Sequence, residues 1–222
     1  GAKVTAHLCS ITYREAADLG IDNLEHGFLA ATDWVAEKEP DQCPRGATQS
    51  YMELDPDGEA FLEVADHLIE RGVAITSTLT VFERRAGGRA PMREGALATI
   101  ADPLREGVAR VSERGTQPAP DFNAWGELLP KAMRMEKLFH DRGGLLVAGT
   151  DPTGAGDVIP GYANLRTLEL LAEIGFGFEE AVRIATLNGA IYLERDQDVG
   201  TVEVGKLADL ILIAGDPTSD VS

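Results

Sequence analysis

The sequence predicts an α/β fold in which parallel strands alternate with helices. Residues 145–148 form a short apolar run between glycines, which is typical of a buried parallel strand. Other strand-like runs end at His7 and His26, and a third spans 73–81, with helical patterns between them. Four successive βα units fit either a small doubly wound sheet or half of an eight-stranded barrel, and the periodicity alone leaves both open.

The first two units are short. Residues 2–7 alternate as a strand does, and Ser10 or Thr12 is suited to cap a helix that stops before Gly20. A second strand is expected over 21–25, directly before His26. Because neighbouring strand residues face opposite sides, we expect Glu25 to point away from His26.

The remaining units are longer and include two extended loops. Apolar residues at helical spacing predict two helices that pack on the sheet. The expected segments are a loop over 28–56, a helix over 58–71, a strand over 73–81, a loop over 82–121 with a short helix at 97–111, a helix over 123–141, the strand at 145–148, a helix over 165–174, another beginning at Glu179, and two strand-like pieces over 199–213.

The composition excludes several classes of function. The 222 residues are 44% hydrophobic, enough for a sizeable core, and carry a formal charge of −17. This charge disfavours nucleic acid and anionic membrane surfaces as partners. No apolar run is long enough to span a bilayer, and the first residues lack signal-peptide features. The compartment stays open, with the cytoplasm slightly favoured.

The two cysteines, Cys9 and Cys43, form neither a disulfide framework nor a CxxC motif. We therefore expect two free thiols. A bridge between them is the alternative, because both follow predicted strand ends.

Three predicted strand ends carry side chains that bind metals: His7, His26 and Asp151. The carboxyl ends of parallel strands are where α/β proteins place ligands. Two imidazoles and one carboxylate suit zinc with an open position for water. The alternative is that each histidine is a hydrogen-bonded structural residue and that Asp151 begins a turn with Pro152.

Five ordered motifs share one resemblance. They are HLCS at 7–10, GIDNLEHG at 20–27, AGTDP at 148–152, ATLNGA at 185–190 and VGKLADL at 204–210. Together they resemble the metal-dependent amidohydrolase superfamily, and within it the imidazolonepropionase-like and prolidase-like enzymes.

The resemblance implies a (β/α)8 TIM-type barrel, of which residues 1–198 form strands five to eight with their helices. Residues 199–222 then belong to a small β-sandwich domain. By the same resemblance His7, on strand five, and His26, on strand six, are metal ligands. Asp151, on strand eight, also binds metal and is the catalytic residue that moves a proton from the attacking water to the leaving nitrogen. The implied cofactor is Zn²⁺, as one or two divalent ions, and the implied activity is hydrolysis of C–N bonds in amides, cyclic amides or peptides.

The departures from the family pattern are as informative as the matches. No His-x-His pair occurs, and none of the five lysines stands where the family's bridging lysine is expected. We therefore expect an internal piece of a longer enzyme, which forms a homo-oligomer or associates with the missing barrel half. A non-catalytic scaffold is the alternative function. Thr153 and Asn164 are weak candidates for substrate contacts.

Overall fold

In the computed structural model, which describes residues 1–93, 95–118, 124–152 and 158–218, four strands form one parallel sheet. The strands lie in sequence order: β1 (Thr5–Ala6), β2 (Asn23–Leu24), β3 (Ala74–Ser77) and β4 (Leu146–Ala148). This order never reverses, which is the arrangement of a barrel rather than of a doubly wound sheet. The carboxyl ends of all four strands therefore meet at one edge.

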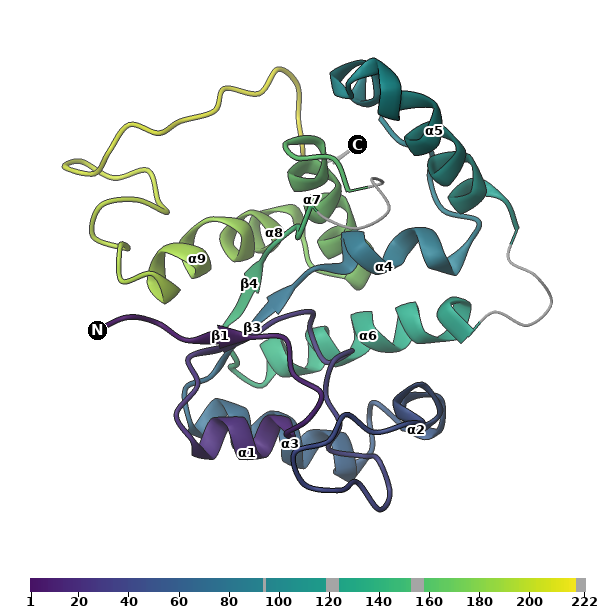
Figure 1. The fold of residues 1–222 in the computed structure, drawn as a ribbon. Helices are drawn as coiled ribbons and strands as arrows, with labels where there is room; N and C mark the ends of the chain where they lie inside the picture. Colours follow the sequence, from purple (N-terminus) through teal and green to yellow (C-terminus); the bar gives the residue numbers. More distant parts are fainter. Residues whose placement is uncertain (94, 119–123, 153–157, 219–222) are drawn as a thin grey trace.

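Helical crossovers join the strands, as parallel pairing requires. Figure 1 shows the strands at the centre, with α1 and α3 below them, α6 to their right, and α8 and α9 above. The helices are α1 (Tyr13–Asp18), α2 (Ala47–Glu53), α3 (Glu59–Glu70), α4 (Leu79–Ala86), the 3₁₀ helix η1 (Ala96–Thr99), α5 (Asp102–Thr116), α6 (Ala124–Asp141), α7 (Tyr162–Ile174), α8 (Phe178–Ala185) and α9 (Leu187–Tyr192).

The main core lies between the sheet and these helices. Leu24, Ile75 and Leu146 come from three neighbouring strands and are fully buried in it. Phe28 fills its centre, with its ring edge-on to Phe61 and to other aromatic neighbours. Burial of such apolar side chains, at about 1.5–3 kcal/mol each, supplies most of the stabilisation that holds the strand ends in place.

Local signals set the start of the first helix as expected. The Thr12 hydroxyl accepts a hydrogen bond from the backbone N–H of Glu15, and the Glu15 carboxylate accepts one from the backbone of Thr12. This capping box satisfies donors that the first turn leaves open. Gly20 follows the helix with a positive φ of 86°, a conformation that glycine adopts without strain.

The structure differs from the prediction around the two long loops. Strand β3 ends at Ser77, and the chain turns directly into α4, so the expected strand over 73–81 is too long. Positions 79, 83 and 86 face inward at helical spacing, which overrides the β-branched composition. Helices α2 and α5 also lie within stretches expected to be largely loop. Lys131 of α6 fastens the end of α2 through hydrogen bonds to the carbonyls of Tyr51, Met52 and Leu54.

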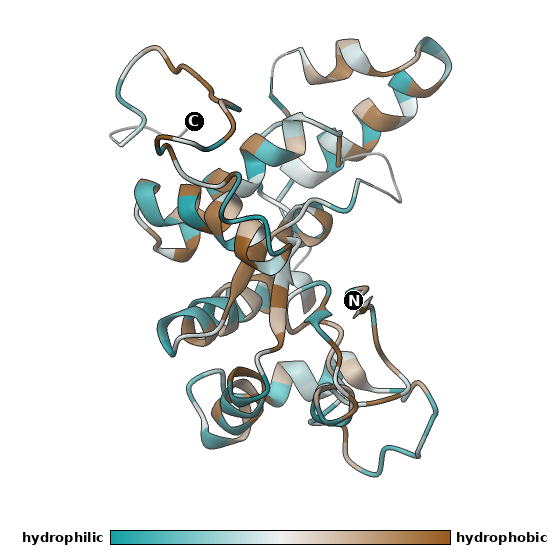
Figure 2. Cartoon of the chain, turned by 90° about the vertical axis from the view of Figure 1, so that its left-hand side faces the viewer, coloured by the Kyte–Doolittle hydropathy of each residue, from teal (hydrophilic) through white to brown (hydrophobic). Residues whose placement is uncertain are grey.

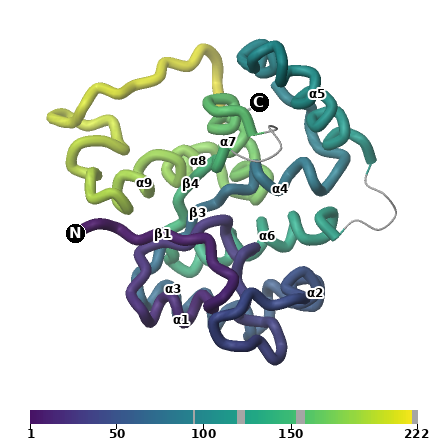
Figure 3. The backbone as a smooth tube through the Cα atoms, in the orientation of Figure 1, coloured from purple at the N-terminus to yellow at the C-terminus, as the bar shows by residue number. Residues whose placement is uncertain are grey.

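The tail after α9 forms no strand over the described residues 199–218, although two strand-like pieces were expected there. Figure 3 shows it as an irregular segment that loops out beyond α9 and turns back, and Figure 2 shows apolar stretches along it. Val204 and Leu212 are fully exposed. A strand needs a partner for its backbone groups, and nothing in the described chain pairs with this segment. Of the helices in the described ranges, none has the length and apolar character that crossing a membrane requires.

Candidate functional site

Polar side chains gather where the four strands end. His7 follows β1, His26 follows β2, Thr78 follows β3 and Asp151 follows β4. His26 and Asp151 both have positive φ angles, 69° and 42°. Few residues other than glycine adopt this left-handed conformation, because it is strained. Residues in such conformations persist only where the surrounding structure holds them, and they cluster at functional sites.

The His26 imidazole lies at the centre of this group. A hydrogen bond of 2.7 Å joins its Nδ1 to the Thr78 hydroxyl, and its Nε2 lies 3.8 Å from the Asp151 carboxylate. The His7 ring packs edge-on against it, with 4.6 Å between ring centroids. Burial, together with the neighbouring His7, lowers the pKa of His26, and the Asp151 carboxylate opposes this shift. The ring is therefore neutral at neutral pH, the form that binds a metal.

One aromatic side chain packs against the imidazole, and a second stacks on the first. The Phe82 ring of α4 stands edge-on to His26 at 5.8 Å between centroids. Phe82 in turn stacks on Trp125 at 5.3 Å, and the Arg85 guanidinium lies over the Trp125 ring. This packing places an aromatic ring of α4 directly against the imidazole.

A pocket of about 290 Å³ opens between the strand ends. Gly149 forms part of its wall, and a Cβ there would lie 2.6 Å from the Thr76 methyl group, so a side chain would displace the neighbouring strand. The pocket is lined by Glu25, His26, Thr76, Thr78, Gly149, Thr150 and Asp151. Its lining thus combines hydroxyls and carboxylates with one imidazole, which suits a small polar substrate.

Glu25 lines this pocket together with His26, so the expectation that it faces away is wrong. The rule of alternating sides applies to extended backbone, and the positive φ of His26 breaks it. The Glu25 carboxylate accepts hydrogen bonds from the Asn23 amide at 2.9 Å and from the Thr5 hydroxyl at 2.5 Å. The bond from Thr5 joins β1 to the end of β2, whereas the bond from Asn23 stays within the β2 segment.

Of the two weaker candidates for substrate contacts, only Asn164 lies within the described residues. Asn164 lines a second pocket, of about 270 Å³, which shares Gly149 and Thr150 with the first. Thr153 lies outside the described residues. Sequence reasoning missed Thr78 as the partner of His26, although the hydroxyl-rich end of its strand was the available signal.

A disulfide and several hydrogen bonds connect the loop after β2 to the segment after β1. Cys9 and Cys43 form a disulfide, so the expectation of two free thiols is wrong and the alternative holds. The Asp33 carboxylate accepts hydrogen bonds from the backbone of Tyr13 at 2.9 Å, and Lys38 donates to the carbonyl of Ser10 at 2.5 Å. The loop folds back over the segment that follows His7, which brings the two sulfurs together.

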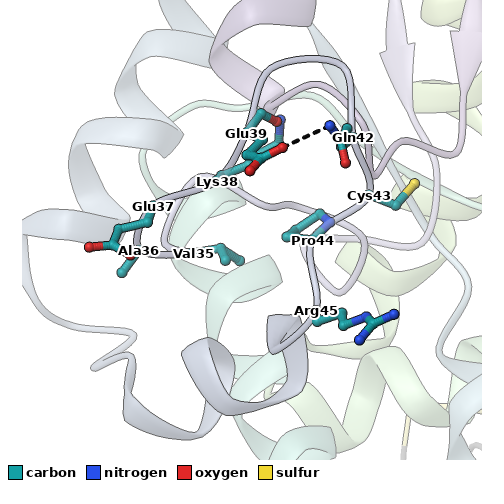
Figure 4. Close-up of a pocket in the computed structure, with 9 residues that line it drawn as sticks. All are labelled: Val35, Ala36, Glu37, Lys38, Glu39, Gln42, Cys43, Pro44 and Arg45. Carbon is teal, nitrogen blue, oxygen red and sulfur yellow. Dashed lines mark hydrogen bonds between the residues drawn. The ribbon is translucent and has the colours of Figure 1, made fainter.

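A further cavity of about 350 Å³ lies within this loop (Figure 4). Its lining comes from residues 35–39 and 42–45, with Glu39 and Gln42 joined by a hydrogen bond of 2.8 Å. None of the strand-end side chains lines it.

The donor types around His26 match those of a zinc site, with imidazole nitrogens and a carboxylate. Within the described ranges, however, no three His, Cys, Asp or Glu side chains lie close enough together to hold an ion. His26 and Asp151 are brought together, and His7 adjoins the His26 ring. The structure thus brings these side chains to one edge of the sheet, but the described residues do not form a closed set of ligands.

A parallel sheet with polar side chains at its carboxyl edge defines a class of α/β proteins whose chemistry resides at the strand ends. The match to the Amidohydrolase family covers residues 44–222. The chain therefore belongs to the amidohydrolase family, and imidazolonepropionases and prolidase structures are among the proteins that it is similar to.

Curated relatives and solved structures agree with this assignment. The imidazolonepropionase of Syntrophobacter fumaroxidans is 30% identical over 151 residues, which is 65% of this chain and 35% of the relative. The 5'-deoxyadenosine deaminase of Methanobrevibacter smithii is 37% identical over 71 residues, 29% of this chain and 16% of that protein. The chain thus spans about a third of the length of the imidazolonepropionase.

Among solved structures, a putative prolidase from Bifidobacterium longum superposes with a TM-score of 0.58 at 24% identity, covering 100% of this chain and 43% of that one. A Xaa-Pro dipeptidase with bound methionine gives 0.57 at 21% identity, covering 99% and 40%. At these identities the likeness shows the fold, that of the amidohydrolase barrels.

Proposed function

We propose that this chain is part of a metal-dependent hydrolase that cleaves C–N bonds of amides, cyclic amides or peptides. Membership of the amidohydrolase family supports hydrolysis of C–N bonds. The observation that carries the proposal is the approach of His26 Nε2 to the Asp151 carboxylate at 3.8 Å, in a pocket at the carboxyl edge of the sheet.

His7, His26 and Asp151 are the proposed metal ligands. Zinc, as one or two divalent ions, suits this donor set, and when bound it would activate a water molecule and polarise the scissile carbonyl. Because the described side chains do not close a site, we infer that further ligands come from outside the described residues. Residues 1–198 would then supply strands five to eight of the barrel, and 199–222 part of the small sandwich domain.

The proposed function gives a role to several side chains in and near the pocket. Asp151 accepts a proton from the attacking water and returns it to the leaving nitrogen. Thr78 holds His26 Nδ1, so that Nε2 faces the site, as partners of ligating histidines commonly do. Asn164, at the adjoining pocket, and Thr153 are proposed to contact the substrate.

We further propose that the chain associates with the rest of the barrel or with a second copy of itself. The exposed apolar residues of the tail support this, because such surface is ordinarily covered. The partners expected at the pocket itself are small amides or peptides, and neither nucleic acid nor a membrane.

The decisive experiment is Asp151→Asn in the longer protein that contains this chain, assayed on a panel of small amides and dipeptides. We expect hydrolysis to fall by about 100-fold or more, because an amide cannot take up the proton. Asp41→Asn is the matched control, since Asp41 is exposed and shares the positive φ. Elemental analysis on the same samples measures the bound metal. Activity that survives in Asp151→Asn rejects the role of this residue, and a wild-type protein that neither binds metal nor turns over any amide supports the scaffold alternative.

A further inference from the structure

A buried acid lies behind the site and outside the chemistry assigned so far. Glu136 of α6 is only 1% exposed. Its carboxyl group fills the space beside Gly27, where a Cβ would collide with Oε1. The Ser77 hydroxyl at the end of β3 lies close to the same carboxyl group and lowers its pKa, against the larger effect of burial. One side chain thus contacts the ends of two neighbouring strands.

The two residues that Glu136 contacts are sequence neighbours of His26 and of the residue that holds its imidazole. Gly27 directly follows His26, and Ser77 directly precedes Thr78, whose hydroxyl binds His26 Nδ1 at 2.7 Å. Gly27 is further fixed by its N–H, which donates to the Thr76 carbonyl at 2.8 Å, and by its own carbonyl, which accepts from the Tyr13 hydroxyl at 2.9 Å. Glu136 therefore supports the backbone of His26 and the hydrogen-bond partner of its ring.

Stability alone does not explain an acid at this position. Oε2 has no hydrogen-bond partner within the described part of the chain. Burial raises the pKa of Glu136 to about 8, so the group is mainly neutral at pH 7. An unpartnered polar atom in a core is costly, and an apolar residue of similar size would avoid that cost. Groups of this kind are concentrated at functional sites.

We propose that Glu136 is a positioning residue that sets the orientation of the His26 imidazole toward Asp151. Its carboxyl group holds the ends of β2 and β3 at a fixed separation through Gly27 and Ser77. The left-handed backbone of His26 and the bond from Thr78 then follow from that separation. The purpose of this arrangement rests on the proposed hydrolase function, but its geometry is testable without any assay of turnover.

The test uses the four histidines as reporters. Long-range ¹H–¹⁵N correlation spectra of the 222-residue chain at a single pH show which ring nitrogen carries the proton in each imidazole. Glu136→Leu removes the polar carboxyl group and keeps the bulk, and Glu136→Gln keeps a neutral polar group of the same shape. Met135→Ala is the control, because Met135 is an equally buried neighbour on α6. His67 and His140, paired with Asp18 and Glu180, serve as internal references.

We expect the wild-type His26 ring to show one dominant tautomer. Glu136→Leu should replace this pattern by averaged shifts, Glu136→Gln should restore it, and His67 and His140 should stay unchanged in both. A wild-type pattern in Glu136→Leu would overturn the proposal, as would an equal disturbance in Met135→Ala. If Glu136→Leu fails to fold, Ser77→Ala provides the same test, since it breaks the contact and leaves the acid in place.

Activity supplies a second readout where the longer protein turns over an amide. Glu136→Leu should lower kcat by about tenfold or more with little change in KM, as loss of ligand-orienting partners does. An inactive wild-type protein would count against the proposed function alone. An unchanged His26 spectrum would count against the positioning role alone, so the two failures are distinguishable.

Discussion

His26 and Asp151 meet because of backbone conformations that few residues other than glycine adopt. At a positive φ each side chain leaves the alternating pattern of its strand and turns over the end of the sheet. The strain, of order 1–3 kcal/mol per residue, is held in place by the packing beneath. A residue-level rule that assumes extended backbone therefore fails at the positions where the chemistry lies, as the orientation of Glu25 shows.

At the same scale, Glu136 predicts a pH dependence of stability. The folded chain retains the Glu136 proton up to a pKa of about 8, whereas the unfolded chain releases it near the ordinary value of 4.5. Its contribution to stability is therefore fully present below pH 4.5 and is lost as the pH rises toward 8, by at most about 1.4 kcal/mol per pH unit.

Urea unfolding of the wild type and Glu136→Gln at pH 5, 6, 7 and 8 isolates this contribution. We expect the stability of the variant relative to the wild type to increase over this range, because Gln does not ionise. A difference that stays constant with pH would show that Glu136 is already ionised in the folded chain.

At the scale of elements, an ion-pair network holds α4 against α7. Glu83 of α4 is 2% exposed and lies 2.5 Å from the Arg166 guanidinium of α7 and 3.1 Å from that of Arg89. Burial opposes ionisation of Glu83, yet the hydrogen bonds and charge of Arg166 keep its pKa below the ordinary value. Since α4 begins directly after Thr78, this network also anchors the wall of the site.

Arg166→Leu should destabilise the chain by about 3 kcal/mol, because it leaves a buried carboxylate with only part of its compensation. Arg110→Leu is the matched control on α5, where an exposed pair with Glu106 contributes no more than about 0.5 kcal/mol. Chemical denaturation at neutral pH measures both. Equal effects of the two substitutions would contradict the structural role of the network.

The order of elements was largely predictable, and their boundaries were not. Turn residues and apolar periodicity placed the four strands and the helices ending near Gly20, Arg71, Asp141 and Ile174. Helix α4 was missed because its sequence begins with Leu-Thr-Val, which favours a strand, and only packing against α6 and α7 selects the helix. The Cys9–Cys43 bridge was left as an alternative because pairing depends on the path of a loop that local sequence does not determine.

For the site, the positions of His7, His26 and Asp151 at one edge follow from parallel topology alone. The contacts that tune them do not, since Thr78 and Glu136 approach from elements far apart in the sequence. The metal site and the roles in catalysis remain proposals drawn from the family.

At the scale of the whole molecule, the disulfide joins two segments 34 residues apart and fixes the loop beside the site. Such a link restricts the unfolded chain and typically contributes about 3–4 kcal/mol for a loop of this length. The hydrogen bonds from Lys38 and to Asp33 remain when the bond is broken, so the fold itself should persist.

Cys43→Ser should therefore lower the free energy of unfolding by about 3 kcal/mol, measured by urea denaturation. The double variant Cys9→Ser with Cys43→Ser should match the single variant, and a thiol reductant should affect only the wild type. If the single variant is as stable as the oxidised wild type, the bridge is not formed in solution.

The close contact between Gly27 and Glu136 should also affect how these two positions vary among relatives. A Cβ at position 27 would collide with the Glu136 carboxyl group, so a residue larger than glycine fits there only when position 136 carries a smaller side chain. Relatives that carry a larger residue after the histidine of this strand should carry a smaller one on the facing helix. Substitutions at the two positions should therefore covary across the family, although the residues lie far apart in the sequence.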